Sequence, residues 1–361
     1  MGYEPLVINY GYKTAAVAIK SPVEKILERI RYLFSSNSTL LQKIQYNLNK
    51  KNRVQAVRIF TDFYRSNLPM NSTNKATFDD LLKSPPECDC YITGSDQVWN
   101  PNIHNNMHEP CCFLHFAESN AKKIAYAPSF GVRDLPEDLG SLLADELKDF
   151  DAISVREKSG AQIIKKYAAI DAEVVLDPTL MADNDIWDSI AKLSDNVPDE
   201  YIFVYRFGNM KVTDKAVDYY RKKLKLPVIE MPVSIHSYGH RTKVRHDIGP
   251  AEFLGLIKNA KLVLTDSFHA SVFSILFKTP FFSFLRQKAG EASNMNGRIL
   301  ELLDTFALND RLITNSNVAS RSTADDINFT RTYEILKEKR ADSQKFLECA
   351  LKGDNKTSYE R

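Results

Sequence analysis

Between residues 261 and 273 the chain has the sequence KLVLTDSFHASVF, in which a polar cluster separates two apolar stretches. KLVL is typical of a buried strand, TDSFHA of a turn and SVFSILF of a helix. The first N–H groups of a helix lack backbone partners and carry the positive end of the helix dipole, so an anion is stabilised there. His269, whose ordinary pKa is about 6.5, could add a proton or a positive charge at the same place. The alternative is that the TDS triplet only caps the helix and that His269 is a partly buried ring.

A second polar turn lies in the segment YITGSDQVWN. Gly94 allows a positive φ angle or the close approach of another backbone segment, and Ser95 and Asp96 follow it at the predicted strand end. Asp96 could act as a general base or hold a sugar hydroxyl. Gln97 and Trp99 could then offer hydrogen bonds and a stacking surface to a carbohydrate. In the alternative interpretation the turn is only a cap and Trp99 belongs to the core.

Three arginines lie directly after apolar runs or early in predicted helices. Arg156, in SVREKSG, follows one strand and precedes a helix. Arg286, in FFSFLRQK, follows a very apolar strand, where an unpaired guanidinium would be costly and a phosphate or carboxylate would stabilise it. Arg298, in MNGRILELL, is placed early in a helix, where its charge is unfavourable to the helix dipole. Each could hold an anionic substrate, although Arg156 could instead pair with Glu157 at the surface and a structural carboxylate could serve Arg298.

From residue 88 onward, short apolar runs alternate with segments of helical periodicity, a pattern typical of parallel sheets covered by helices. The predicted strands are CDCYITGSD, KKIAYAPSFG, DAISVRE and AEVVLDPTLM, and then YIFVYRFG, LPVIEMPV, KLVLTDSF and TPFFSFLR. Asp, Asn and Pro accumulate near residues 183–200, which indicates a domain boundary. We therefore predict an α/β protein of two doubly wound, Rossmann-like domains facing a cleft, over residues 1–190 and 191–322, followed by a helix and polar tail over residues 323–361. Ligands bind such sheets at the carboxyl ends of the strands.

The composition disfavours several classes of function. The formal net charge of +2, from 48 Lys and Arg against 46 Asp and Glu, argues against a nucleic-acid binder. Five cysteines without CxxC pairs predict reduced thiols and no metal site. No apolar run approaches the roughly 20 residues that span a bilayer, and the first residues lack the apolar core of a signal peptide, so a cytoplasmic protein is expected. The motifs GxGxxG, GxxxxGK[S/T] and HExxH are absent, which disfavours nicotinamide, P-loop nucleotide and zinc-protease functions.

Basic residues are concentrated near the N-terminus. Residues 20–65 contain ten basic and three acidic residues, and their segments VEKILERIRYLF and VQAVRIFTDFYR have the periodicity of amphipathic helices. One interpretation is a solvated helix face. The other is contact with an anionic membrane surface or an anionic substrate, which would place the chain peripherally at the cytoplasmic face of the membrane.

The ordered set of segments between residues 88 and 312 resembles the polysaccharide pyruvyl transferase family. The segments that carry the likeness are YITGSDQVWNP, KIAYAPSFG, ISVREKSGAQIIKK, VVLDPTLM, GPAEFLGLIKNAKLVLTDSFHASVFSILFKTPF and GRILELLDTFALNDR. The resemblance implies a fold similar to two-domain, GT-B-like glycosyltransferases. It also implies a reaction in which phosphoenolpyruvate places a pyruvate ketal on a sugar of a surface or capsular polysaccharide precursor, with release of phosphate.

The resemblance further assigns roles to individual residues. His269 matches the family's central histidine and Arg156 the arginine of its SVRE segment, both implicated in handling phosphoenolpyruvate. We expect His269 to be the acid and Asp96 the base or hydroxyl anchor, with the donor on the C-terminal domain and the acceptor on the N-terminal one. The other residues expected to bind substrate are Gly94, Ser95, Gln97, Ser267, Ala270, Ser271, Arg286 and Arg298. No cofactor or metal is expected, and the partners are phosphoenolpyruvate and a saccharide acceptor that could be lipid-linked.

Two departures from the family pattern are visible. Many members carry an arginine two residues before the central histidine, where this chain has Ser267. We therefore expect Arg286 or Arg298 to supply the positive charge. The family also usually begins with an additional strand, a Gly- and Asn-rich turn and a helix before the segment that matches GYEPLVINY, and this chain is expected to start after them.

Two other functions stay open from the sequence. The same two-domain scaffold could serve a nucleotide-sugar-dependent glycosyltransferase, because a fold does not determine a function. Protection from thermal unfolding by UDP-sugars but not by phosphoenolpyruvate would favour it. The chain could also be an inactive, truncated homologue that acts as a binding partner.

Overall fold

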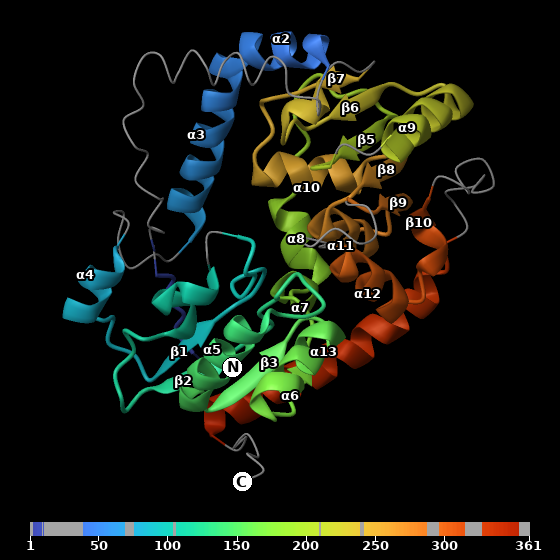
Figure 1. The fold of residues 1–361 in the computed structure, drawn as a ribbon. Helices are drawn as coiled ribbons and strands as arrows, with labels where there is room; N and C mark the ends of the chain where they lie inside the picture. The colour runs from blue at the N-terminus through green and yellow to red at the C-terminus, as the bar shows by residue number, and fades with distance from the viewer. Residues whose placement is uncertain are drawn as a thin grey trace.

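The computed structural model describes residues 3–8, 10, 39–68, 76–103, 106–208, 211–238, 242–286, 296–314 and 327–353. The chain forms two separate β-sheets, each with helices packed on it (Figure 1). Every pair of neighbouring strands in both sheets is parallel. The predicted α/β fold with two parallel sheets is therefore confirmed.

The first sheet has four strands in the order β1-β2-β3-β4. They are β1 (Cys90–Thr93), β2 (Lys122–Ala125), β3 (Ala152–Val155) and β4 (Glu173–Val174). The helices between them are α5 (Glu137–Glu146) and α6 (Lys158–Ala168). Their apolar faces bury Leu143 and Ile163 in one core with Ile153 of β3. All four residues of β3 are buried, as expected for a parallel strand covered on both faces.

The second sheet has six strands in the order β10-β9-β8-β5-β6-β7. They are β5 (Ile202–Tyr205), β6 (Val228–Glu230), β7 (Lys243–Val244), β8 (Leu262–Thr265), β9 (Phe281–Phe284) and β10 (Leu312–Ile313). Its helices are α9 (Lys211–Leu224), α10 (Pro250–Lys258), α11 (Phe268–Leu276) and α12 (Gly297–Thr305). The inner strands β8 and β9 are buried throughout, which explains their unbroken apolar sequences. The edge strands β7 and β10 have two residues each and were not predicted from the sequence.

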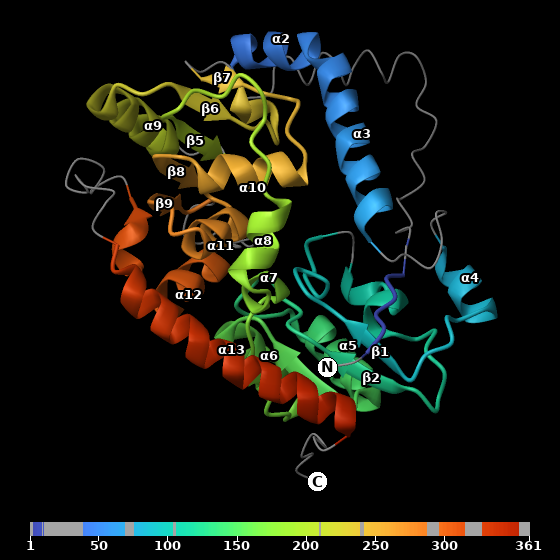
Figure 2. The same cartoon turned by 180° about the vertical axis from the view of Figure 1, so that it is seen from behind.

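Three helices connect the two sheets. They are α7 (Pro178–Met181), α8 (Asn184–Ile190) and the long α13 (Phe329–Lys352). Helix α13 runs along one side of both layers (Figures 1 and 2). Its Leu336 belongs to a core of the second domain, whereas its Phe346 and Ala350 pack with Ile124 of the first sheet. The C-terminal helix therefore packs against the cores of both domains. Short 3-10 helices are formed by Asn106–His108, Pro110–Phe113, Leu147–Asp149, Ile235–Ser237 and Asn309–Arg311.

The N-terminal helices pack at the periphery of the two domains, and Leu81 of the third belongs to the core of the first domain. They are α2 (Leu40–Leu48), α3 (Lys50–Asn67) and α4 (Phe78–Lys83). No described residue of α3 is buried, and this helix lies on the side of the molecule opposite α13 (Figures 1 and 2). Residues 20–38 of the predicted basic segment and the predicted polar tail after residue 353 lie outside the described residues. Among the described helices, none combines the length and the apolar character needed to cross a membrane.

Candidate functional site

Polar side chains from both sheets meet at the carboxyl ends of their strands, where doubly wound folds bind ligands. In the first domain, Asp96 follows β1, Arg156 follows β3 and Asp177 follows β4. In the second domain, His269 lies in the first turn of α11, shortly after β8, and Arg298 lies in the first turn of α12. The contacts described below join these five residues across the domain boundary.

Arg156 and Asp177 form the buried centre of the site. Arg156 Nη1 donates to Asp177 Oδ2 over 2.8 Å, and Arg156 Nε donates to Glu157 Oε1 over 2.7 Å. The guanidinium carbon of Arg156 also lies 4.3 Å from the centre of the Phe268 ring in α11, a cation–π contact with the second domain. Arg156 is therefore an interior residue that contacts both domains; its pairing with Glu157 is confirmed, but the surface position of that alternative is wrong.

Burial and neighbouring charges act against each other on this pair. Burial alone would raise the pKa of Asp177, but the contact with His269 and the charge of Arg156 outweigh it and hold that pKa well below its ordinary value. Burial alone would lower the pKa of Arg156, whereas the carboxylates of Glu157 and Asp177 raise it above its ordinary value. Both groups are charged at neutral pH.

His269 faces the same buried carboxylate. Its Nε2 lies 3.8 Å from Asp177 Oδ2, and 35% of its side chain is exposed. The exposed part of the ring can at the same time contact a bound molecule. His269 thus has the surroundings that a proton donor requires.

Asp96 lies at the solvent-facing side of the arginines. Its Oδ1 is 3.4 Å from both Nη1 and Nη2 of Arg156 and 3.8 Å from Nη1 of Arg298. Its backbone adopts a left-handed φ of 54°, and its carbonyl oxygen accepts the N–H of Ser129 over 2.7 Å. With 55% of its side chain exposed, the carboxylate can still accept a hydrogen bond from a ligand.

Two further arginines at the site have spare hydrogen-bonding capacity. Within the described part of the chain, the buried Nε atoms of Arg298 and Arg286 have no hydrogen-bond partner. Burial and the charge of Arg156 lower the pKa of Arg298 to about 10, so it stays charged at neutral pH without full compensation. Arg286 lies over the Phe207 ring at 4.4 Å and donates to the backbone oxygen of Asp266 over 3.2 Å. A bound anion would balance the charge of both arginines and accept hydrogen bonds from them.

A cavity of about 370 Å³ lies between the domains beside Arg298. Arg156, Asp177 and Phe268 also line it, together with residues of β4, α12 and α13. Asp96 and His269 do not line the cavity but contact residues that do, through the distances given above. Its volume lies in the range of about 300–1,000 Å³ typical of small-molecule sites.

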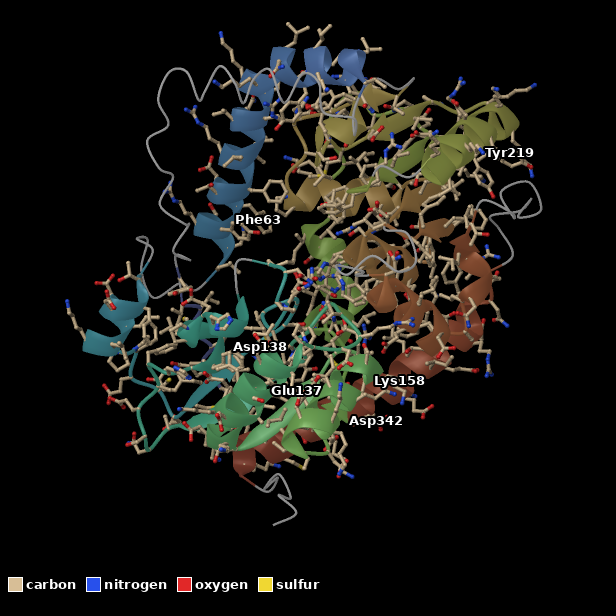
Figure 3. The ribbon with its side chains drawn as sticks, viewed as in Figure 1. Phe63, Glu137, Asp138, Lys158, Tyr219 and Asp342 are labelled. Atoms are coloured by element: carbon tan, nitrogen blue, oxygen red, sulfur yellow. The ribbon has the colours of Figure 1, made fainter. Side chains whose placement is uncertain are left out.

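One anion already occupies a helix N-terminus at this cavity. Glu301 of α12 accepts the N–H of Lys158 over 2.6 Å and the N–H of Ser159 over 3.3 Å, at the first turn of α6. The side chain of Lys158, labelled in Figure 3, reaches α12 in turn, with Nζ 3.5 Å from Asp304 Oδ2. A carboxylate is favourable at this end of the helix dipole. These contacts connect the two domains next to the arginine cluster.

The N-terminus of α11 is not arranged as predicted. The Ser267 hydroxyl caps the helix by accepting the N–H of Ala270, and the Ser267 carbonyl accepts both the N–H and the hydroxyl of Ser271. The buried Ser271 hydroxyl also contacts Ser283 Oγ at 2.9 Å. Because these groups are engaged inside the protein, the geometry favours the capping alternative over direct anion binding by Ser267, Ala270 and Ser271.

The turn after β1 is partly structural. Gly94 has a φ of 120°, and a Cβ atom there would lie 2.0 Å from the carbonyl oxygen of Tyr126, so only glycine fits. Ser95 Oγ lies 3.0 Å from Asp177 Oδ2, and Gln97 Oε1 accepts from Asn100 Nδ2 over 2.6 Å. The side chains of Ser95 and Gln97 are therefore hydrogen-bonded to other residues of the protein.

Trp99 is fully buried, and its ring stacks on Phe113 at 5.6 Å. The predicted carbohydrate-stacking surface at Trp99 is wrong. Trp99 belongs to the core of the first domain instead, which is the alternative left open from the sequence.

Asp177 is the site residue that the sequence reasoning missed. It lies in the quoted segment VVLDPTLM, directly after β4, and it also caps the short helix α7 by accepting the N–H of Thr179 over 3.0 Å. Its position after an apolar run was the available signal. The following proline made it look like an ordinary turn residue, because Asp before a helix-initiating Pro is a common cap.

The sequence as a whole was compared with known protein families. The sequence model of the family described as polysaccharide pyruvyl transferase matches residues 4–287. The chain belongs to this family. The match contains Arg156, Asp177, His269 and Arg286, and Arg298 lies beyond its end. As a polysaccharide pyruvyl transferase family member, the chain is a transferase.

Three solved structures to which the chain is similar are distant from it in sequence. The UDP-GlcNAc 2-epimerase from Methanocaldococcus jannaschii has 13% identity and a TM-score of 0.41, over 78% of this chain and 95% of that one. The UDP-GlcNAc 2-epimerase from Neisseria meningitidis bound to UDP-GlcNAc has 11% identity and a TM-score of 0.39, over 91% and 90%. MurG of Acinetobacter baumannii has 10% identity and a TM-score of 0.36, over 82% and 88%. Likenesses of this size support no conclusion about activity or substrate. A comparison with curated proteins found no match.

Proposed function

We propose that this family member transfers the enolpyruvyl unit of phosphoenolpyruvate to a sugar of a surface polysaccharide precursor and closes a pyruvate ketal. The observation that carries the proposal is that Arg298 and Arg286, next to a cluster that contains His269, have Nε atoms without a hydrogen-bond partner among the described residues. Phosphoenolpyruvate carries a phosphate and a carboxylate, and guanidinium groups are suited to both. Ser267 stands where many relatives have an arginine, so these two arginines replace that charge.

The donor binds on the C-terminal side of the cleft and the sugar on the N-terminal side. Arg156 already donates to Glu157 and Asp177, with longer contacts to Asp96. It therefore positions these carboxylates more than it binds the donor. The interdomain cavity beside Arg298 provides room for a small anionic donor. Asp96, exposed above the arginines, is placed to meet a sugar hydroxyl.

The reaction requires one acid and one base. His269 protonates the methylene carbon of phosphoenolpyruvate while a sugar hydroxyl adds to the central carbon and gives its proton to Asp96. The C–O bond to phosphate then breaks, and phosphate leaves with the bonding electrons and the proton held by Asp96. A second hydroxyl of the same sugar attacks the same carbon, and its proton restores His269. One phosphoenolpyruvate and two hydroxyls thus give one ketal and one phosphate.

The test is release of inorganic phosphate from phosphoenolpyruvate across a panel of free and lipid-linked saccharides. We expect phosphate release that depends on an acceptor and a mass increase of the acceptor that matches one ketal. Phosphoenolpyruvate should also raise the Tm of the chain, whereas UDP-sugars should not. The converse pattern would favour a nucleotide-sugar-dependent enzyme. A folded chain that binds neither compound would support an inactive homologue.

Replacing Arg298 by glutamine should raise KM for phosphoenolpyruvate by roughly 10- to 100-fold, because charge-assisted hydrogen bonds contribute about 1.5–3 kcal/mol. The Tm without donor should stay the same or rise, since a buried and poorly compensated charge is removed. Steady-state kinetics and thermal unfolding check both statements. The control is Arg331→Gln on the exposed face of α13, which should change neither quantity. An unchanged KM in Arg298→Gln would remove this residue from the donor site.

A further inference from the structure

Helix α3 has an inner face that contacts the second domain, and Val54 and Val57 are exposed on its outer face. On the inner face, Ile59 packs at Gly249, the residue before α10. Arg53 lies over the Tyr46 ring at 3.5 Å, and Tyr46 in turn contacts the Tyr238 ring edge-on at 5.8 Å. These contacts fix the helix on the second domain and determine which side chains point away from it.

The outer face carries an exposed apolar row. Val54 and Val57 are 50% and 66% exposed. Their spacing of three residues places them on one side of the helix. The preceding helix α2 adds a second row of exposed apolar residues, spaced by three and then four residues: Leu41, Ile44 and Leu48. Contiguous exposed apolar side chains of this kind mark an interaction surface.

A basic row runs beside the apolar row of α3. Lys51, Arg58 and Arg65 are exposed and are spaced by seven residues, which is close to two helical turns. From residue 50 to 67 there are five basic residues and one acidic residue, Asp62. An apolar row flanked by Lys and Arg is the arrangement of helices that lie in the interface of an anionic bilayer. A protein partner would have to match both rows, whereas a lipid surface matches them without specific contacts.

We infer that the outer face of α3, together with the apolar row of α2, docks on an anionic phospholipid surface. The apolar side chains enter the headgroup region, and the basic row contacts lipid phosphates. The inference is independent of the proposed reaction, since no residue of the site contributes to it. Its consequence for the reaction is that the chain would work beside a membrane, where a lipid-linked acceptor would be concentrated.

The experiment is co-sedimentation of the full chain with vesicles of phosphatidylcholine, with and without 30 mol% phosphatidylglycerol. We expect binding to the phosphatidylglycerol vesicles at low salt, and loss of that binding at high salt, because surface charges are screened. The variant K51E/R58E/R65E should partition at least about tenfold less. The matched control K211E/K215E/K222E, on exposed positions of α9, changes the net charge equally and should bind like the original chain.

The apolar row has its own variant. Val57→Asp should weaken binding at low salt, whereas Leu82→Asp, at a 52% exposed leucine of α4, should not. Neither change touches the site, so phosphate release in the absence of vesicles should be normal in both. The inference is overturned if phosphatidylglycerol does not increase co-sedimentation of the original chain. It is equally overturned if the α9 control loses as much binding as the α3 variant. It is also overturned if the chain is a dimer that Val57→Asp dissociates while vesicles have no effect, since a second copy would then be what covers α3.

Discussion

Replacing His269 by alanine is expected to lower turnover with phosphoenolpyruvate by about 10²- to 10⁴-fold, the contribution of a well-placed proton donor. The physical reason is that His269 presents a partly exposed ring next to the cluster of Arg156 and Asp177, where the donor is proposed to bind. His269 combines an exposed ring with a buried carboxylate 3.8 Å away. The measurement is acceptor-dependent phosphate release at saturating donor.

Donor binding should separate the chemical role of His269 from a structural one. His269→Ala should keep most of the rise in Tm caused by phosphoenolpyruvate, because the arginines that hold the anion are intact. His269→Gln preserves the ring's approximate size and hydrogen bonding but cannot donate a proton to carbon, so it should be as inactive as the alanine variant. The control His115→Ala removes another part-exposed histidine, paired with Glu146 on the surface of the first domain, and should have full activity. Near-normal turnover in either His269 variant would contradict the assignment.

The fold could be predicted because the local signals agree with the tertiary structure. Parallel strands covered on both faces must be continuously apolar, and β8 and β9 show this in the sequences LVLT and FFSF. The two-residue strands β7 and β10 were not predicted, because neither lies in a longer apolar run like the VVL that marks the equally short β4. They are the two edge strands of the second sheet, where β7 pairs with β6 and β10 pairs with β9.

The sequence predicted which residues lie at the strand ends that form the site, but it did not predict which partners their side chains contact. The rule that ligands bind at carboxyl strand ends selected Asp96, Arg156 and His269, which the structure brings into one cluster. Which polar side chains keep an unused hydrogen-bonding group could not be predicted, because that depends on residues distant in the chain. Ser267 is engaged within its own helix, whereas Arg298 lies 3.8 Å from the Asp96 carboxylate and its Nε has no partner in the part of the chain that the structure describes.

Asp177→Asn is expected to destabilise the folded chain by about 3–5 kcal/mol, the cost of breaking a buried ion pair by removal of one partner. The amide cannot compensate the charge of Arg156, which would keep Glu157 as its remaining close carboxylate. Urea unfolding at neutral pH measures the change. The control is Asp171→Asn, which removes an exposed pair with Lys165 and should cost less than about 1 kcal/mol.

The pH dependence identifies the charge as the cause. In the folded chain the pKa of Asp177 lies below that of an unfolded aspartate, about 3.9. Its stabilisation is therefore fully present above pH 4 and is lost as the pH falls below that value toward the folded-state pKa. The difference in unfolding free energy between the original chain and Asp177→Asn should be constant between about pH 5 and 8 and should shrink in more acidic solution. A difference that is independent of pH would mean that packing, not charge, is what Asp177 contributes.

Asp177 should also affect turnover beyond its effect on stability. Its proposed role is indirect. It accepts hydrogen bonds from Arg156 and from the Ser95 hydroxyl, and it lies 3.8 Å from His269. At a temperature where Asp177→Asn is fully folded, kcat should fall while KM for phosphoenolpyruvate changes little, because Arg298 and Arg286 are untouched. Combining it with Arg156→Gln should cost less stability than the two single changes added together, since both disrupt the same ion pair. Full additivity would show that the two residues act independently and that the buried pair does not organise the cleft.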